Sequence, residues 1–94
     1  MPKAIEDIKD ILKYTQMTWG PTQRTLYKQA IDKCIQSVGQ TPQPRTKADE
    51  CVPGYLRRHI GKGYRHYVFY RIGEDVVVVV RLLHDSMDFM RHLK

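Results

Sequence analysis

Apolar side chains recur at helical spacing in the first part of the chain. Between residues 3 and 18 they lie three or four positions apart, and charged side chains occupy the opposite side. The apolar positions are Ala4, Ile5, Ile8, Ile11 and Leu12. This pattern predicts an amphipathic helix. Gly20 and Pro21 follow, and because proline cannot continue a helix but suits the first turn of one, they predict that a second helix begins at Pro21.

The same spacing continues from Pro21 to Val38, and Gly39 then predicts the end of the second helix. Two such helices joined by a tight turn form an antiparallel hairpin with a shared apolar seam. Residues 40–54 contain three prolines and no apolar period, so they are predicted to be a loop. Cys34 falls on the apolar side of the second helix, and we expect it to be buried; Cys51 lies in the loop, and we expect both cysteines to be reduced.

From Tyr55 onward the pattern changes to one typical of strands. Residues 55–60, 64–72 and 76–84 are rich in aromatic and β-branched residues and are separated by GKG and GED, which predicts a three-stranded antiparallel meander. The valine run 76–80 is apolar on both faces, so we expect it to form the best-protected strand. Asp85 or Ser86 is then predicted to cap a short last helix, with Met87, Met90 and Leu93 on one side.

The sequence therefore predicts one α+β domain over residues 1–94, with an N-terminal helical hairpin packed on a small twisted antiparallel sheet and a short C-terminal helix. The chain has 94 residues and a net charge of +6, which favours an acidic partner. No stretch reaches the roughly 20 apolar residues that cross a bilayer, and no secretion signal is recognisable, so we expect a soluble, cytoplasmic protein. No cofactor is expected.

Four stretches in this order and spacing resemble a known family: AIEDIKDILKYT, TWG, VPGYLRRHIGKGYRHYVFYRI and VVVVVRLLHDSMD. They resemble the ParE branch of the ParE and RelE toxin superfamily. The resemblance implies a small toxin in a hetero-oligomer with a ParD-like antitoxin, without direct binding to nucleic acid. ParE members poison DNA gyrase, whereas RelE members cut messenger RNA in the ribosome. Relatives usually open with a strand before the first helix, which is absent here, so we expect an open sheet edge that invites a partner strand.

An enzyme that cleaves RNA needs an acid, a base and cations that converge on the scissile phosphate. The set considered for that alternative is Arg65, His66, Arg81 and His84. In the ribosome-dependent nucleases, two catalytic arginines occupy positions that correspond to His66 or Tyr67 and to Ser86 in this sequence. The resemblance therefore implies that both catalytic cations are absent here, which favours a toxin that acts by binding. An inactive relative that only binds antitoxin is the third alternative.

The resemblance and the charge pattern lead to two sets of binding residues. The antitoxin is expected to contact Ile5, Ile8, Leu12, Tyr27, Ile31, Arg57, Arg58 and Arg65, with acidic side chains against the arginines. The target is expected to contact Arg71, Arg81, His84, Met87, Asp88, Phe89, Arg91 and His92. Residues 54–72 contain five Lys or Arg and no acid, which indicates a docking surface.

Two further residue patterns have an ordinary structural interpretation. His84, Asp88 and His92 are spaced four apart, as metal ligands on one helix would be, but His84 is expected to end a strand as a hydrogen-bonded packing residue, so no metal site is predicted. Trp19 could stack on nucleic acid, but its place at the helix turn predicts that it seals the end of the hairpin seam.

Overall fold

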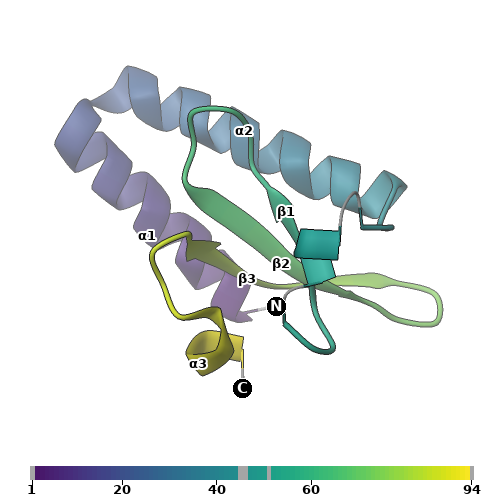
Figure 1. Cartoon of the computed structure of the whole chain (residues 1–94). Helices are drawn as coiled ribbons and strands as arrows, with labels where there is room; N and C mark the ends of the chain where they lie inside the picture. The colour runs from purple at the N-terminus through teal and green to yellow at the C-terminus, as the bar shows by residue number, and fades with distance from the viewer. Residues whose placement is uncertain (1, 45–46, 51, 94) are drawn as a thin grey trace.

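The computed structural model describes residues 2–44, 47–50 and 52–93. Along the chain the elements are α1 (Pro2–Trp19), α2 (Pro21–Gln40), the 3₁₀ turn η1 (Lys47–Glu50), β1 (Leu56–His59), β2 (His66–Ile72), β3 (Val77–His84) and α3 (Phe89–Leu93). Figure 1 shows the long α1–α2 hairpin behind the sheet and the short α3 near the C-terminus. The predicted α+β class, with two helices, an antiparallel sheet and a last short helix, is confirmed.

The helical hairpin turns at Gly20, where φ is +95°, a conformation that glycine adopts without steric cost. The predicted end of α2 at Gly39 is wrong, because the helix continues through Gly39 to Gln40 and ends where Thr41 donates its backbone N–H to Ser37 O at 2.9 Å. The prediction for Trp19 is also wrong. Its side chain is 70% exposed, at the turn of the hairpin, which projects past the ends of the strands (Figure 1).

The sheet has the order β1-β2-β3, with both pairs antiparallel. β2 is therefore the central strand, and its residues Val68, Phe69 and Tyr70 are all buried. The valine run forms β3 at an edge instead, so the prediction that it is the best-protected strand is wrong. Its apolar character on both faces reflects contacts above and below the sheet, which say nothing about a strand's neighbours within the sheet.

Each face of the sheet has its own hydrophobic cluster. On the hairpin face, Val68, Val79 and Leu82 pack with α1 and α2 residues, including Cys34, which is buried as predicted. On the opposite face, Phe69 and Leu83 pack with Leu93 of α3 and with Val52. Side chains therefore alternate along β2 as predicted for a strand. Cys51 lies outside the described residues.

The last helix differs from its prediction in both start and orientation. It begins at Phe89, because Asp85 and Ser86 bond to Arg65 and His84 and lie in a turn rather than at a helix cap. Leu93 is its buried residue, and Phe89 is partly buried one turn earlier. Met87 and Met90, which were predicted to lie on the same side as Leu93, are 42% and 46% exposed.

Candidate functional site

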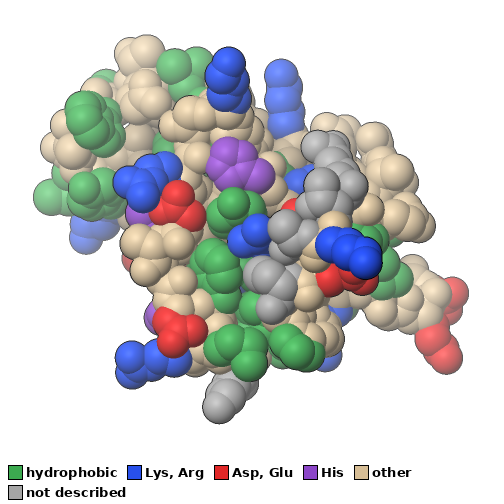
Figure 2. Space-filling view, in the orientation of Figure 1, with side chains coloured by type: hydrophobic (Ala, Val, Ile, Leu, Met, Phe, Trp, Pro, Cys, Tyr) green, Lys and Arg blue, Asp and Glu red, His purple; other side chains and the backbone are tan. Residues whose placement is uncertain are grey.

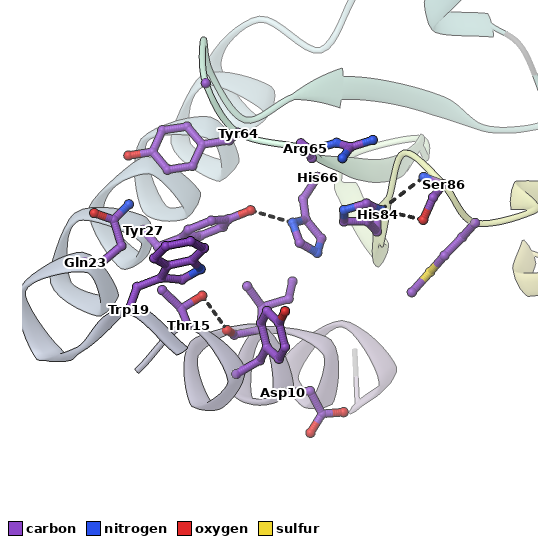
Figure 3. A pocket seen from close by; sticks show the side chains of 14 residues that line it. Asp10, Thr15, Trp19, Gln23, Tyr27, Tyr64, Arg65, His66, His84 and Ser86 are labelled. Carbon is purple, nitrogen blue, oxygen red and sulfur yellow. Dashed lines mark hydrogen bonds between the residues drawn. The ribbon is translucent and has the colours of Figure 1, made fainter. Parts of the chain in front are cut away.

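A groove of about 830 Å³ lies between the helical hairpin and one end of the sheet. It is called the hairpin groove below. Its walls combine aromatic, aliphatic and polar side chains, shown in Figure 3. The lining residues are Asp10, Ile11, Tyr14, Thr15, Trp19, Gln23, Tyr27, Gly63, Tyr64, Arg65, His66, His84, Ser86 and Met87. A concave surface of this size with a few polar groups is typical of a binding site.

Tyr27 and His66 form the polar centre of the groove wall. The Tyr27 hydroxyl lies 2.5 Å from His66 Nδ1, and the Tyr27 ring meets the Tyr64 ring edge-on at 4.7 Å between centroids. Burial raises the pKa of Tyr27. Burial and the neighbouring His84 lower the pKa of His66 to about 4. At neutral pH the Tyr27 hydroxyl is therefore the donor and a neutral His66 the acceptor.

His84 extends this network toward the tail, with its ring edge-on to His66 at 5.0 Å. The Ser86 backbone N–H donates to His84 Nδ1 at 3.1 Å, and the Ser86 hydroxyl lies 2.7 Å from the same nitrogen. Because Nδ1 accepts these bonds, the ring proton resides on Nε2, and the 3.3 Å approach of Asp85 to Nδ1 is not an ion pair in that state. The prediction that His84 is a hydrogen-bonded packing residue is confirmed.

Arg65 lies at the rim of the groove, and its guanidinium bonds to Asp85 at 3.1 and 3.2 Å. The hydrogen bond from Arg65 holds the pKa of the Asp85 carboxyl below its usual value. Deeper in the groove, the Thr15 hydroxyl donates to Ile11 O at 2.8 Å. Tyr27 is thus paired with His66 and Ser86 with His84, while Thr15 and Arg65 are bonded to neighbouring groups. The walls present mainly aromatic and aliphatic surface to an occupant.

The candidate catalytic set is only partly assembled. Arg65, His66 and His84 all line the hairpin groove. Arg81 lies outside it and donates to both carboxylate oxygens of Asp7 on α1, at 2.7 and 3.0 Å. The Asp7 carboxylate raises the pKa of Arg81 and also accepts the Leu82 backbone N–H at 3.0 Å. The arrangement therefore joins α1 to the edge of the sheet, away from the two histidines.

Comparison with known proteins supplies the family. Residues 1–89 match the family model for the ParE toxin of the type II toxin-antitoxin system parDE. The chain belongs to the ParE toxin family. Toxin ParE1 of Mycobacterium tuberculosis is 33% identical over 93 residues, which cover 98% of this chain and 92% of the relative. Toxin ParE1 of Caulobacter vibrioides is 32% identical, covering 97% and 91%, and toxin ParE of Escherichia coli is 32% identical, covering 97% and 86%.

Membership of the ParE family implies a cognate antitoxin, and the structure distributes the residues assigned to that partner unevenly. Tyr27 and Arg65 line the hairpin groove, Ile5 is 50% exposed, and Ile8 is partly buried beside the core. Three of the remaining four need correction as surface contacts, and Arg57 is described below. Leu12 and Ile31 are buried in the core because they face the sheet, and Arg58 is 3% exposed because its guanidinium donates to Ser37 Oγ and to the carbonyls of Thr41 and Gln43.

The positive run in residues 54–72 does not form one surface of this ParE chain. Arg58 faces the hairpin, whereas Arg57 lies over the Tyr67 ring on the other face of the sheet, 4.3 Å from its centroid, and 3.9 Å from Asp49. Lys62 and Arg65 lie at the β1–β2 end of the sheet and Arg71 near the opposite end. On the face drawn in Figure 2, Lys and Arg side chains are scattered singly, several beside acids. The predicted docking surface is therefore divided.

Among the residues assigned to the target, Arg71, Met87, Asp88, Arg91 and His92 are exposed. Phe89 and His84 are partly buried, and Arg81 is held by Asp7.

A metal site formed by His84, Asp88 and His92 would require all three on one helix, but His84 ends β3 while His92 belongs to α3. No group of three potential metal-binding side chains occurs in residues 2–44, 47–50 and 52–93. Among the same residues, no helix is long and apolar enough to cross a membrane.

Several groove residues were not predicted from the sequence to belong to a binding site, above all Tyr14 and Trp19, which are 67% and 70% exposed. The sequence did contain a signal for a binding site at this end of α1. Tyr14, Met17 and Trp19 are large apolar side chains off the buried stripe of α1, crowded into its last two turns. Large apolar side chains that a helix does not need for its own packing are typical of interaction sites.

Proposed function

We propose that this ParE-family chain acts by binding, inhibits DNA gyrase, and is neutralised in a hetero-oligomer with a ParD-like antitoxin. The main support is the position of Arg81. It is paired with Asp7 at 2.7 and 3.0 Å and does not line the groove that contains His66 and His84. Cleavage of RNA needs cations close to the developing negative charge. With Arg65 also paired to Asp85, no unpaired arginine lines the groove among the residues that the structure describes.

His66 supports the same proposal. A pKa of about 4 keeps its ring neutral at physiological pH, so it cannot supply a proton as a general acid there. Its Nδ1 is occupied by the Tyr27 hydroxyl. A neutral aromatic wall is better suited to packing against another protein than to stabilising charge.

The antitoxin is proposed to place an amphipathic helix in the hairpin groove. Tyr14, Trp19 and Met87 offer exposed apolar contacts along it, and apolar anchors in a groove are the usual basis of helix recognition. Arg65 stands at the rim with 68% of its side chain exposed, where an acidic residue of the antitoxin could replace Asp85. Of the arginines expected to meet acidic antitoxin residues, Arg65 is retained in this proposal and the buried Arg58 is not.

The target is proposed to contact the exposed residues of the tail, namely Met87, Asp88, Met90, Arg91 and His92. They lie in and before α3 and are exposed, whereas Leu93 of the same helix is buried. Flexible thioethers beside charged groups are suited to adaptable recognition. This surface adjoins the groove at Met87, so an antitoxin helix in the groove would approach the target surface as well.

The deciding experiment measures supercoiling by purified gyrase with increasing amounts of the chain, and in parallel the integrity of transcripts on translating ribosomes. Loss of supercoiling with intact transcripts is expected, and added antitoxin should restore supercoiling. Cut transcripts with normal supercoiling would instead support the ribosome-dependent nuclease. No effect in either assay, with retained antitoxin binding, would indicate the inactive relative.

The docking site can be tested separately with Trp19→Ala and Met90→Ala, because both remove an exposed apolar side chain. The first should weaken antitoxin binding by about tenfold, as truncation of an interface aromatic does. The second should leave antitoxin affinity unchanged and reduce gyrase inhibition. Equal effects of the two variants on the antitoxin would argue against the groove as its site.

A further inference from the structure

His66 presents a hydrogen-bond donor to the hairpin groove that has no partner among the described residues. Its Nδ1 accepts the Tyr27 hydroxyl, so at neutral pH the ring proton lies on Nε2. Figure 3 shows the first nitrogen joined to Tyr27 and the second unbonded. Among the same residues, the fully buried side-chain nitrogens and oxygens without a partner are Arg57 Nε and Arg58 Nε. Nε2 of His66 is therefore open to the groove that its ring lines.

His84 adds a second donor of the same kind beside the first. The two histidines are direct partners across β2 and β3, and their rings lie edge-on with centroids 5.0 Å apart. Nδ1 of His84 accepts the Ser86 N–H, so its ring proton also lies on Nε2. That atom likewise has no hydrogen-bond partner in residues 2–44, 47–50 and 52–93. Two neighbouring rings thus each offer the groove one N–H.

The charges around these donors are already balanced. The carboxylates that act on His66 are Asp7 of α1 and Asp85, and each is bonded to an arginine. Arg65 is the cation among the described residues that line the groove, and Asp10, also in the lining, is an acid. A carboxylate of an occupant would lose its water here without gaining an unpaired cation, which costs free energy. The donors are therefore matched to a neutral acceptor.

The chemistry of a helix restricts which neutral acceptor can reach them. Along the middle of a helix the backbone carbonyls are bonded within the helix, so the acceptor must come from a side chain. A Ser or Thr hydroxyl is short and tends to bond to its own helix backbone. The carboxamide of Asn or Gln is uncharged, and its oxygen has two lone pairs. It is the group best suited to two N–H donors in a groove with the exposed aromatic side chains Tyr14 and Trp19.

We propose that one Asn or Gln of the antitoxin helix accepts hydrogen bonds from Nε2 of His66 and of His84, and that this contact fixes the register of the helix in the groove. The inference rests on the proposed function, because it takes the antitoxin as the occupant. Apolar contacts alone allow a helix to slide along a groove. A helix in the wrong register would leave both donors buried and unpaired, which is costly, so a single polar contact selects one position. The same cost disfavours antitoxins without the amide.

The first test uses amide side chains that imitate one histidine nitrogen each. The amide of Asn reaches the place of Nδ1, and that of Gln reaches the place of Nε2. His66→Asn therefore keeps an acceptor for Tyr27 but loses the groove donor, whereas His66→Gln does the reverse. His66→Asn should weaken antitoxin binding by about three- to tenfold, the effect of one neutral hydrogen bond, and His66→Gln by less than about twofold.

A histidine that only packs in the groove wall predicts a different order. The Gln variant breaks the bond to Tyr27, so it would then bind antitoxin no better than the Asn variant. The pair His84→Asn and His84→Gln should repeat the expected order, since Asn keeps an acceptor for Ser86. Equal affinities within each pair, or weaker binding by the Gln variants, would overturn the proposal.

The unmodified chain provides a test that does not depend on how variants fold. In the antitoxin complex the Nε2 protons of both rings, followed by nuclear magnetic resonance, should exchange with water at least about tenfold more slowly than in the free chain. Calorimetry in two buffers of different ionisation enthalpy should find no proton uptake at pH 7. Uptake of about one proton would mean that a carboxylate charges a histidine, and would overturn the neutral acceptor, as would unprotected Nε2 protons.

Trp19→Ala separates this contact from the proposed function. If Trp19→Ala weakens antitoxin binding and His66→Asn does not, the helix lies in the groove but the amide contact is wrong. If neither variant changes the affinity, the groove is not the antitoxin site, and both proposals fail.

Discussion

The two faces of the sheet are both rich in aromatic residues, yet one is open and the other closed. On the hairpin face, Tyr64 and His66 join Tyr27 in a wall that remains accessible along the hairpin groove. On the opposite face, Tyr67 and Phe69 are covered by Phe89 of α3, with ring centroids 5.9 and 4.8 Å apart. Alternate residues of one strand thus serve two purposes. The difference lies in the covering element, because the hairpin projects past the sheet at its turn, whereas the short α3 folds onto it.

The largest expected difference between the faces is in stability. Phe69→Ala on the closed face should lower the free energy of unfolding by about 3–5 kcal/mol, because Phe69 is 1% exposed and its removal leaves a cavity. Trp19→Ala on the open face should change it by less than about 0.5 kcal/mol, since Trp19 is 70% exposed. Denaturant unfolding of both variants measures this. Similar losses in the two would mean that the groove rim is part of the core.

The helix α3 offers a sharper comparison within a single turn. Leu93→Ala should cost about 2–3 kcal/mol, because Leu93 is 5% exposed and closes the cluster under Phe69 and Leu83. Met90→Ala, at a position 46% exposed, should cost less than about 0.5 kcal/mol. Thermal and denaturant unfolding test the pair. If toxicity falls for Leu93→Ala alone, and in proportion to stability, the tail is structural and does not contact the target.

The next largest effect concerns the ion pair between Asp7 of α1 and Arg81 of β3 at the edge of the sheet. Asp7→Asn should lower stability by about 1–3 kcal/mol, because the carboxylate accepts two bonds from Arg81 and one from the Leu82 N–H, and its side chain is only 14% exposed. Lys28→Ala is the control, since its ion pair with Asp32 is exposed and should contribute at most about 0.5 kcal/mol. Equal and small losses would show that solvent screens the Asp7–Arg81 pair.

The smallest expected effect is pH dependence confined to the open face. His66 has a folded pKa of about 4 against an ordinary 6.5, so the unfolded chain binds more protons between these values. Stability contributed by neutral His66 is complete above pH 6.5 and is lost as pH falls toward 4. At pH 5 the loss should be about 1 kcal/mol, allowing for partial solvent access. Unfolding of His66→Gln over the same pH range is the comparison, and an identical slope in the variant would exclude His66 as the cause.

Much of the fold could be predicted because each element leaves a local signal. Apolar spacing gave both long helices, and the GKG and GED turns between β-branched segments gave the meander. The groove was harder to predict. His66 and His84 were expected near one another as members of a catalytic set, but Tyr14 and Trp19 were not expected at the same site, because nothing in a single helix reveals where its partner sheet ends.

Misassigned residues share one physical cause. Arg58 looked like a surface charge because arginine is rarely buried without partners, but Ser37 and two backbone carbonyls provide those partners inside. Arg81 looked available for a phosphate, but Asp7 lies more than seventy residues earlier in the chain and pairs with it only after folding. Charged residues are assigned to solvent by default, and only the fold reveals their long-range partners.

The sequence by itself determined the periodic elements, their order, the basic charge and the motifs that resemble ParE toxins. All of these are set by residues near one another in the chain. Tertiary structure alone decided which strand lies at the edge, which aromatic face stays open, and which arginines remain exposed. These depend on where distant segments meet, since a side chain's burial and ion pairs are properties of its spatial neighbours, and local spacing does not specify them.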